Sequence, residues 1–194
     1  MQDKWRNVRM NIIRICQEKE LSDEFVWFND DFILTRPVDD WRAFTNMHVG
    51  TLKERAERFR QSEPSRWRHG FAFNNNLLEG MGVQDPLDFE YHGPILYNKS
   101  RLLEMYERPE INTYLGVSDV LLFTRSLYGN LYPREIPGRQ IRDVKLLADM
   151  DDESILTEYG FFSVADGLIG YPGKAPKLNG WLLENLGTKS RYEK

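Results

Sequence analysis

The sequence has little cysteine, little net charge and no long apolar run. A single cysteine, Cys16, excludes an internal disulfide framework and fits a reducing compartment. A net charge of −4 gives no bulk electrostatic sign of a nucleic-acid-binding protein. No apolar run approaches the ~20 residues that a helix needs to span a bilayer. Residues 1–4 do not begin a signal peptide, so we expect a soluble, cytoplasmic protein.

What is present is typical of a folded globular chain. Hydrophobic residues make up 41% and aromatic residues 13% of the 194 positions, which argues against wholesale disorder. This length is enough for one domain with a substantial core. No internal repeat or low-complexity tract divides the chain. We therefore expect a single α/β domain over residues 1–194, in which residues 170–194 form a tail rich in Gly, Pro and Lys.

One stretch carries the strongest functional signal. The apolar run 25–28 (Phe-Val-Trp-Phe) predicts a buried strand, and Asn29, Asp30 and Asp31 follow it directly. The carboxyl ends of strands are where open α/β sheets bind ligands. Adjacent carboxylates repel one another unless a cation or hydrogen bonds offset the charge, and hard oxygen ligands suit Mg²⁺ or Mn²⁺. The alternative is an Asx turn or a helix cap, and spacing does not decide between the two.

Residues 4–19 are expected to form a helix ahead of this strand. An apolar face recurs at helical spacing and consists of Trp5, Val8, Ile12 and Ile15. A separate polar stripe is made of Lys4, Asn7, Asn11 and Arg14. Such a stripe is either the solvated face of the helix or, for Lys4 and Asn7, a pair of side chains that point into the ligand site.

Other elements follow from local patterns. We expect helices over 39–60 and 120–128, a strand or turn feeding a helix over 95–106, turns at the asparagines 74–76, and short strands at 140–146 and 161–163. Ser118 and Asp119 are placed to cap the helix 120–128. The basic run from Lys53 to Arg68 is either a solvated helix face or an anion-binding arm.

The segment from Ser22 to Phe32 resembles the "FLYFNDD" block of the Stealth proteins. That family comprises capsular-polysaccharide sugar-phosphate transferases and their lysosomal-enzyme N-acetylglucosamine-phosphotransferase relatives. The segment is more similar still to small phage and prophage proteins of the glycosyltransferase type. The resemblance implies a GT-A-like mixed sheet flanked by helices. It also implies a Mg²⁺ or Mn²⁺ ion at Asp30 and Asp31, and a UDP-sugar or similar nucleotide-sugar donor.

His92 is the second informative residue. It precedes a Gly-Pro turn at Gly93 and Pro94, where an imidazole can act as acid or base near neutral pH. The alternative is an ordinary surface histidine in a turn. In the Stealth resemblance a similar His-x-Pro is implicated in catalysis, which implies that His92 deprotonates an acceptor hydroxyl or orients the donor phosphate.

Weaker blocks resemble those of the small phage proteins: Arg125 to Asn130, Asp143 to Lys145, and Lys189 to Glu193. The resemblance also implies an arginine near Ser118, where this chain lacks one, and Arg125 is a possible substitute. Asn130 and Lys145 are alternatively a helix stop and an edge-strand lysine. The predicted donor- and acceptor-binding residues are Lys4, Asn7, Asn29, Arg68, Asp119, Arg125, Asn130 and Lys145.

Together these signals predict a metal-dependent nucleotide-sugar transferase with Asp31 and His92 as catalytic residues. The acceptor would be a glycan or a phage-type modified DNA base. The alternative is a non-catalytic binding or inhibitor protein on a truncated glycosyltransferase scaffold. GT-A folds place a nucleotide-binding βαβ unit before the metal motif, where this chain has about 24 residues. We therefore expect a homo-oligomer, or a partner chain that supplies the missing N-terminal half.

Overall fold

The computed structural model describes residues 4–29, 31–117, 119–134, 138–148, 158–165, 168 and 173–187, with the backbone alone at residues 4 and 5. The helices are α1 (Lys4–Gln17), α2 (Trp41–Phe44), α3 (Leu52–Phe59), α4 (Arg66–Gly80), α5 (Lys99–Glu107), α6 (Pro109–Asn112), α7 (Thr124–Leu131) and α9 (Pro176–Leu186). The strands are β1 (Glu24–Trp27), β2 (Phe32–Leu34), β3 (Met47–His48), β4 (Ile95–Asn98), β5 (Arg139–Gln140), β6 (Lys145–Leu146) and β7 (Phe161–Val164). Helices and strands are interspersed along the chain, which agrees with the predicted α/β class.

The described strands form small separate sheets and not one mixed sheet. β1 pairs with β4 in antiparallel register from Glu24 opposite Asn98 to Trp27 opposite Ile95. β2, β7 and β6 form a mixed sheet in that order, and β3 pairs with β5 in parallel. The apolar run after Glu24 is therefore a strand, as predicted. It is only half-buried, so the predicted burial of this strand is wrong, and it belongs to a two-stranded sheet.

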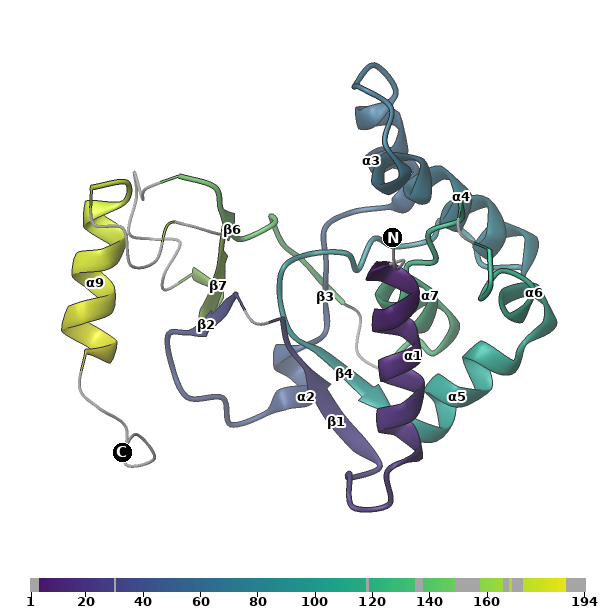
Figure 1. Ribbon diagram of the computed structural model, residues 1–194, viewed down its shortest axis with the longest axis horizontal. Helices are drawn as coiled ribbons and strands as arrows, with labels where there is room; N and C mark the ends of the chain where they lie inside the picture. The colour runs from purple at the N-terminus through teal and green to yellow at the C-terminus, as the bar shows by residue number, and fades with distance from the viewer. Residues whose placement is uncertain are drawn as a thin grey trace.

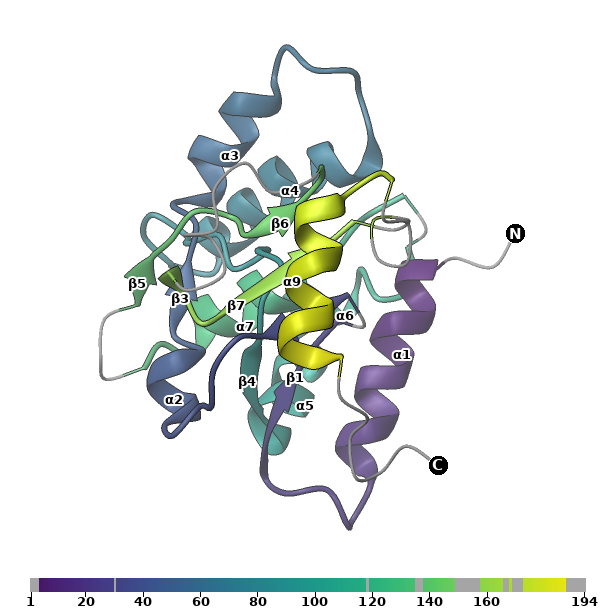
Figure 2. The ribbon, with the colours of Figure 1, turned by 90° about the vertical axis from the view of Figure 1, so that its left-hand side faces the viewer.

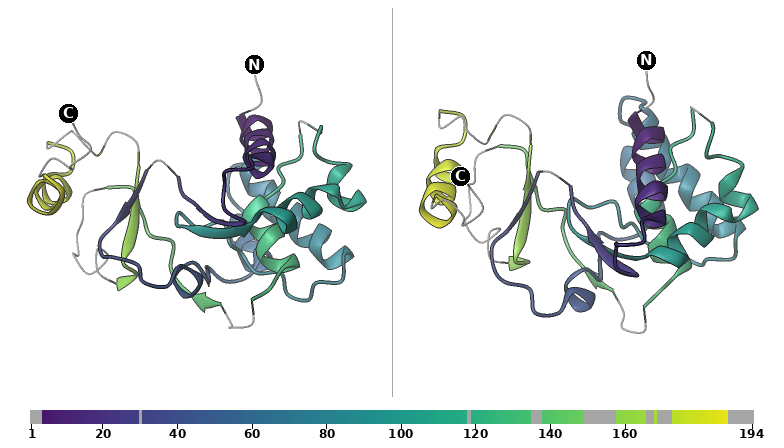
Figure 3. Two further views of the ribbon diagram at one scale, coloured as in Figure 1. Left: turned by 90° about the horizontal axis from the view of Figure 1, so that it is seen from below. Right: turned by 60° about the horizontal axis from the view of Figure 1, so that its bottom comes forward.

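The elements gather in two groups that β1 and β2 connect (Figure 1). Helices α1 and α3 to α7 surround the largest hydrophobic cluster, at whose centre Phe71, Tyr97 and Phe123 are almost fully buried. The β2–β7–β6 sheet packs against α9 through a smaller cluster around Phe162 and Leu178, and the separation of the two groups is clear from below (Figure 3). Among the described helices, none is both long and apolar enough to cross a bilayer.

Helix α1 buries a face that overlaps the predicted one. Arg9, Ile12 and Cys16 are buried and Ile15 is half-buried, whereas Val8 is 37% exposed. The buried stripe is therefore centred nearer to Arg9 and Cys16 than the predicted stripe is. The helix packs against α5. Sequence periodicity thus identified the helix and part of its inward face, and it missed the buried Arg9.

Several other predicted elements have different bounds in the structure. The expected helix over 39–60 is divided into α2, capped by Asp40, and α3, whose Thr51 and Glu54 form a capping box. The asparagines 74–76 lie inside α4 and do not form a turn. Helix α7 begins only at Thr124, with no side-chain cap, so Asp119 does not cap it. The predicted strand 140–146 is two short strands in different sheets, β5 and β6.

Candidate active site

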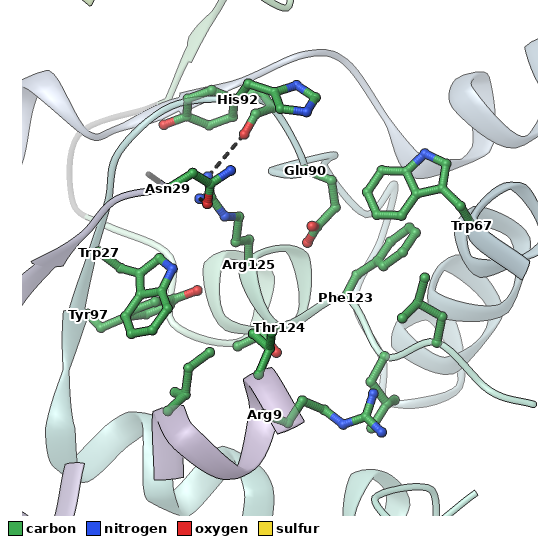
Figure 4. Close-up of a pocket in the computed structure, with 15 residues that line it drawn as sticks. Arg9, Trp27, Asn29, Trp67, Glu90, His92, Tyr97, Phe123, Thr124 and Arg125 are labelled. Carbon is green, nitrogen blue, oxygen red and sulfur yellow. Dashed lines mark hydrogen bonds between the residues drawn. The ribbon is translucent and has the colours of Figure 1, made fainter. Parts of the chain in front are cut away.

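A cavity of about 160 Å³ lies where α1, the end of β1, the segment before β4 and the start of α7 meet. Its polar lining is Arg9, Asn29, Glu90, His92, Thr124 and Arg125, and its aromatic walls are Trp27, Trp67, Tyr97 and Phe123. His92 and Asn29 lie at one end and Arg9 at the other (Figure 4). Two of the residues predicted from the strongest sequence blocks, Asn29 and His92, therefore share one cavity.

His92 is held by a carboxylate from a distant part of the chain. Its Nδ1 lies 3.1 Å from both Oδ1 and Oδ2 of Asp143, and its backbone N–H donates to Asp143 Oδ1 at 3.2 Å. An ionised carboxylate only accepts hydrogen bonds, so Nδ1 carries the proton and the neutral ring has its lone pair on Nε2. No described residue hydrogen-bonds Nε2. The imidazole thus has the tautomer that a general base requires, and His92 lines the cavity.

The carboxylate of Asp143 is itself stabilised in its ionised form. Burial acts to raise its pKa, but hydrogen bonds and charge from His92, together with the nearby Arg55, outweigh burial and hold the pKa below its usual value. Arg55 Nη2 lies 3.6 Å from Asp143 and Arg55 Nε lies 3.8 Å from the fully buried Asp88. Burial raises the pKa of Asp88 to about 6. The side chain of Arg55 is 15% exposed and links two acidic residues, whereas the sequence analysis assigned Arg55 only to a basic run.

Arg125 fixes the loop that carries His92 to the end of β1. Its Nη1 donates to the carbonyls of Tyr91 at 3.0 Å and Gly93 at 2.5 Å, on either side of His92. Its Nη2 donates to Asn29 Oδ1 at 3.0 Å. Arg125 is 9% exposed, and these three hydrogen bonds all go to neutral oxygen atoms. Arg125, predicted to bind donor or acceptor, acts in this arrangement as a positioning residue.

Glu90 adds a protonatable group two residues before His92. Its Oε1 accepts from the backbone N–H of Ser126 at 3.1 Å and lies 3.3 Å from the Ser126 hydroxyl. Burial raises the pKa of Glu90 to about 7, against the lowering effect of Arg125. A carboxyl group with this pKa exchanges its proton near neutral pH, and such groups cluster at functional sites. The sequence interpretation did not include Glu90.

Helix α1 contributes Arg9 to the cavity, and the predicted Asn7 does not line it. Arg9 is 3% exposed and its Nη2 donates to Leu115 O at 3.4 Å. Asn7 is exposed, and the side chain of Lys4 lies outside the described residues. Arg9 shares its buried stripe with Ile12 and Cys16, and an arginine on an apolar stripe was a signal that the sequence did contain.

Asp31 forms a second polar cluster. Its Oδ2 accepts from Ser163 Oγ at 2.7 Å and from Lys145 Nζ at 3.1 Å. Burial acts to raise the pKa of Asp31, but the bonds from Ser163 and Lys145 outweigh it and lower the pKa. The predicted residue Lys145 is therefore a partner of Asp31, and it belongs to β6.

The residues around Asp31 do not form a metal donor set as they stand. No group of three or more His, Cys, Asp or Glu side chains converges on one point within the described parts of the chain. A divalent cation on Asp31 Oδ2 would also meet the Lys145 ammonium at close range. Asp30, the other predicted ligand, lies outside the described residues. The metal stays a prediction.

One short segment, residues 143–145, contributes a side chain to each of the two clusters. Asp143 holds His92, and Lys145, two residues later, holds Asp31. Side chains two residues apart in an extended chain point to the same side at a spacing of about 7 Å. The segment 143–145 therefore brings the two strongest sequence blocks into one region.

The remaining predicted site residues do not line the cavity. Arg68 donates to the Glu63 carbonyl and packs over the Phe59 ring between α3 and α4. Asn130 bonds both the N–H and the carbonyl of Leu87, which is a structural role. Asp119 is exposed in the loop before α7.

A comparison with protein-family models and with curated proteins finds no match to the chain.

Proposed function

We propose that the chain transfers a sugar or sugar-phosphate group from a nucleotide-sugar donor to a hydroxyl group, with His92 as the general base. The observation that carries this proposal is the orientation of the imidazole. Asp143 occupies Nδ1 and leaves Nε2 with a lone pair at the end of a cavity that also contains two buried arginines. A histidine held in this way is typical of groups that remove a proton during transfer reactions.

In the proposed reaction the acceptor hydroxyl gives its proton to Nε2 of His92. The acceptor oxygen then forms a bond to the transferred carbon or phosphorus atom, while the bond from that atom to the donor oxygen breaks. The nucleotide leaves with the electron pair, and the proton passes from His92 to solvent. Asp143 stabilises the imidazolium that forms, because its ionised carboxylate lies 3.1 Å from Nδ1.

The electrostatics of the cavity favour an anionic reactant. Arg9 and Arg125 both line the cavity and are more than nine-tenths buried. Glu90 is the acid among the polar lining residues, and its raised pKa keeps it partly protonated near pH 7. Two guanidinium groups beside a partly protonated acid support the binding of a phosphate group or the stabilisation of a developing negative charge.

The small volume of the cavity limits the size of the chemical group that can enter it. Sites for drug-sized ligands occupy roughly 300–1,000 Å³, whereas this cavity measures about 160 Å³. It can accommodate the reacting part of a donor or acceptor, and the nucleotide would extend outside it. No step of the proposal uses a metal ion. The predicted acceptors, a glycan or a modified DNA base, and the predicted partner chain or homo-oligomer remain predictions.

A panel of nucleotide-sugars, each with and without Mg²⁺ or Mn²⁺, tests the proposal through the release of free nucleotide. Wild-type protein should release nucleotide from at least one donor, and His92→Ala should abolish most of that release. His69→Ala is the matched control, because His69 is exposed on α4 and does not line the cavity. Donor binding without release, unchanged in His92→Ala, would contradict the proposal and favour the non-catalytic binding protein.

A further inference from the structure

A second hollow lies on the chain, away from His92. It is a groove of about 670 Å³ between α2, β4, β5, the start of α5 and the residues that follow α7. These elements lie next to one another in Figure 2. Its charged lining consists of four arginines, Arg42, Arg101, Arg134 and Arg139, and two carboxylates, Glu24 and Asp40. The groove is thus locally basic in a chain whose net charge is −4.

The two carboxylates are already engaged. Glu24 Oε2 accepts from Arg42 Nη2 at 2.5 Å and from Arg42 Nε at 3.2 Å. Asp40 Oδ1 accepts from the backbone N–H groups of Arg42 and Ala43, which caps α2. Neither carboxylate forms a described ion pair with Arg101, Arg134 or Arg139. These three guanidinium groups hold the positive charge of the groove.

Arg134 is the least exposed of these three arginines. Its guanidinium donates to the Arg42 carbonyl, to Thr45 Oγ1 at 3.0 Å and to the Leu96 carbonyl at 3.4 Å. All of these acceptors are neutral, and no described carboxylate lies within ion-pair distance. Burial lowers the pKa of Arg134 below its ordinary value, which reflects the cost of keeping a charge there. A half-buried cation that faces a groove without a negative partner gains stability when an anion binds.

Arg101 and Arg139 lie on the outer part of the groove and are exposed. Arg101 lies over the Tyr132 ring at 5.8 Å and Arg139 over the Tyr159 ring at 4.8 Å. Stacking on an aromatic ring holds a planar guanidinium in place while its N–H groups remain able to bind an anion. Arginine binds phosphate oxygens with two parallel hydrogen bonds, which a lysine cannot do.

We propose that this groove is a binding site for a phosphate-bearing nucleotide unit, either a free nucleotide or part of a nucleic-acid strand. The inner and outer guanidinium groups would bind its phosphates. Pro133, which is exposed, provides apolar surface along the same groove, against which a base or sugar ring can pack. The volume falls within the usual range for ligand sites. The site is independent of the reaction proposed for His92, since it shares none of the groups in that mechanism.

Equilibrium binding with three probes tests the site: inorganic pyrophosphate, uridine monophosphate and a fluorescent twelve-nucleotide single strand of deoxythymidine. We expect Arg101→Gln/Arg139→Gln to weaken binding about tenfold or more, because two charge-assisted contacts are lost. For the strand, the slope of log K against log salt should decrease by roughly 1.4, at 0.7 per lost phosphate contact. Arg60→Gln is the matched control, because Arg60 is exposed at the end of α3 outside the groove.

The probes separate the two sources of the ligand. Equal affinity for the monophosphate and the strand identifies a free nucleotide, and a much tighter strand with a steep salt dependence identifies nucleic acid. Arg134→Met should weaken the binding of every probe further than the double variant does. Circular dichroism checks that this variant folds. His92→Ala should bind all probes as wild type does. The proposal is overturned if no probe binds at millimolar concentration, if Arg60→Gln has the same effect as the double variant, or if His92→Ala abolishes binding.

Discussion

Two aspartates in this chain hold cationic or protonatable partners, and they differ in what they leave available. Asp143 bonds one nitrogen of His92 and leaves the other nitrogen without a described partner. Asp31 bonds the Lys145 ammonium and the Ser163 hydroxyl through the same oxygen. The first arrangement leaves a ring nitrogen without a described partner on a residue that lines the cavity. The second neutralises a charge between β2, β6 and β7.

The difference shows that the stronger sequence signal does not lie in the cavity that His92 lines. Asn29, Asp30 and Asp31 form the clearest motif, yet the described Asp31 is engaged by an ion pair. His92 was the weaker signal, and it gains an orienting carboxylate 51 residues away in the chain. Three-dimensional partners, which local sequence does not display, decide what each group can do.

The largest expected effect is on turnover. Replacing His92 with Ala removes the proposed base, and general-base catalysis contributes about 10²–10⁴-fold in rate. We expect nucleotide release to fall within this range, with the melting temperature changed little, because the side chain is partly exposed. His69→Ala should retain wild-type activity. Equal losses in the two variants would show that His92 has no special role.

Asp143→Asn tests the orienting partner. The amide can donate to Nδ1, which favours the wrong tautomer and places the proton on Nε2. We expect nucleotide release to fall by about a hundredfold, while the KM for the donor changes less than kcat. Glu104→Gln, at an exposed ion pair on α5, serves as the control. Full activity in Asp143→Asn would contradict the proposed base.

The elements that place these residues were only partly predictable. The strand before Asn29 and the strand-to-helix unit of β4 and α5 follow from local apolar patterns and were predicted. The division into small sheets was not, because pairing of β1 with β4 depends on contacts some 70 residues apart. Periodicity indicates that an element exists more reliably than it indicates its neighbours.

The same limit applies to the site. Arg55 was assigned to a charged helix face, because a buried arginine and a solvated one look alike in a basic run. Its inward position depends on Asp88 and Asp143, both far away in the sequence. Glu90 was missed because its raised pKa results from burial, which no local pattern shows. Arg9 could have been found from the stripe it shares with Ile12 and Cys16.

Glu90 provides a pH test on stability. Its pKa is about 7 in the folded protein against an ordinary value of 4.5, so the folded state keeps a proton that the unfolded state loses. Between about pH 4.5 and 7 the free energy of unfolding therefore decreases with rising pH, by about 3–4 kcal/mol in total, and this contribution is constant above pH 7.

Urea titrations of wild type and Glu90→Gln across this range measure the effect. Glutamine keeps an oxygen acceptor for Ser126 but has no proton to lose, so wild type should lose stability relative to the variant as pH rises. The other carboxyl groups, including Asp88, are present in both proteins. Their contributions to the pH dependence of the free energy of unfolding therefore cancel in the difference. A difference that is independent of pH would contradict the buried, protonated Glu90.

The smallest expected effect concerns the second aspartate. Lys145→Met leaves Asp31 with the Ser163 hydroxyl alone, and we expect a loss of about 1–2 kcal/mol of stability. Lys53→Met, at an exposed position of α3, should cost much less. If Mn²⁺ instead raises the melting temperature of wild type and not of Asp31→Asn, the metal prediction is right and Asp31 is more than an ion-pair partner.

The tautomer of His92 tests the central claim most directly and requires no substrate. The chain has only three histidines, so ¹⁵N-labelled imidazoles can be assigned from His92→Gln and His69→Ala. In the neutral ring we predict a protonated Nδ1 and an unprotonated Nε2 for His92, and a shift toward the other tautomer in Asp143→Asn. A proton on Nε2 in the wild-type protein, unchanged in Asp143→Asn, would contradict the account of His92 as a base oriented by Asp143.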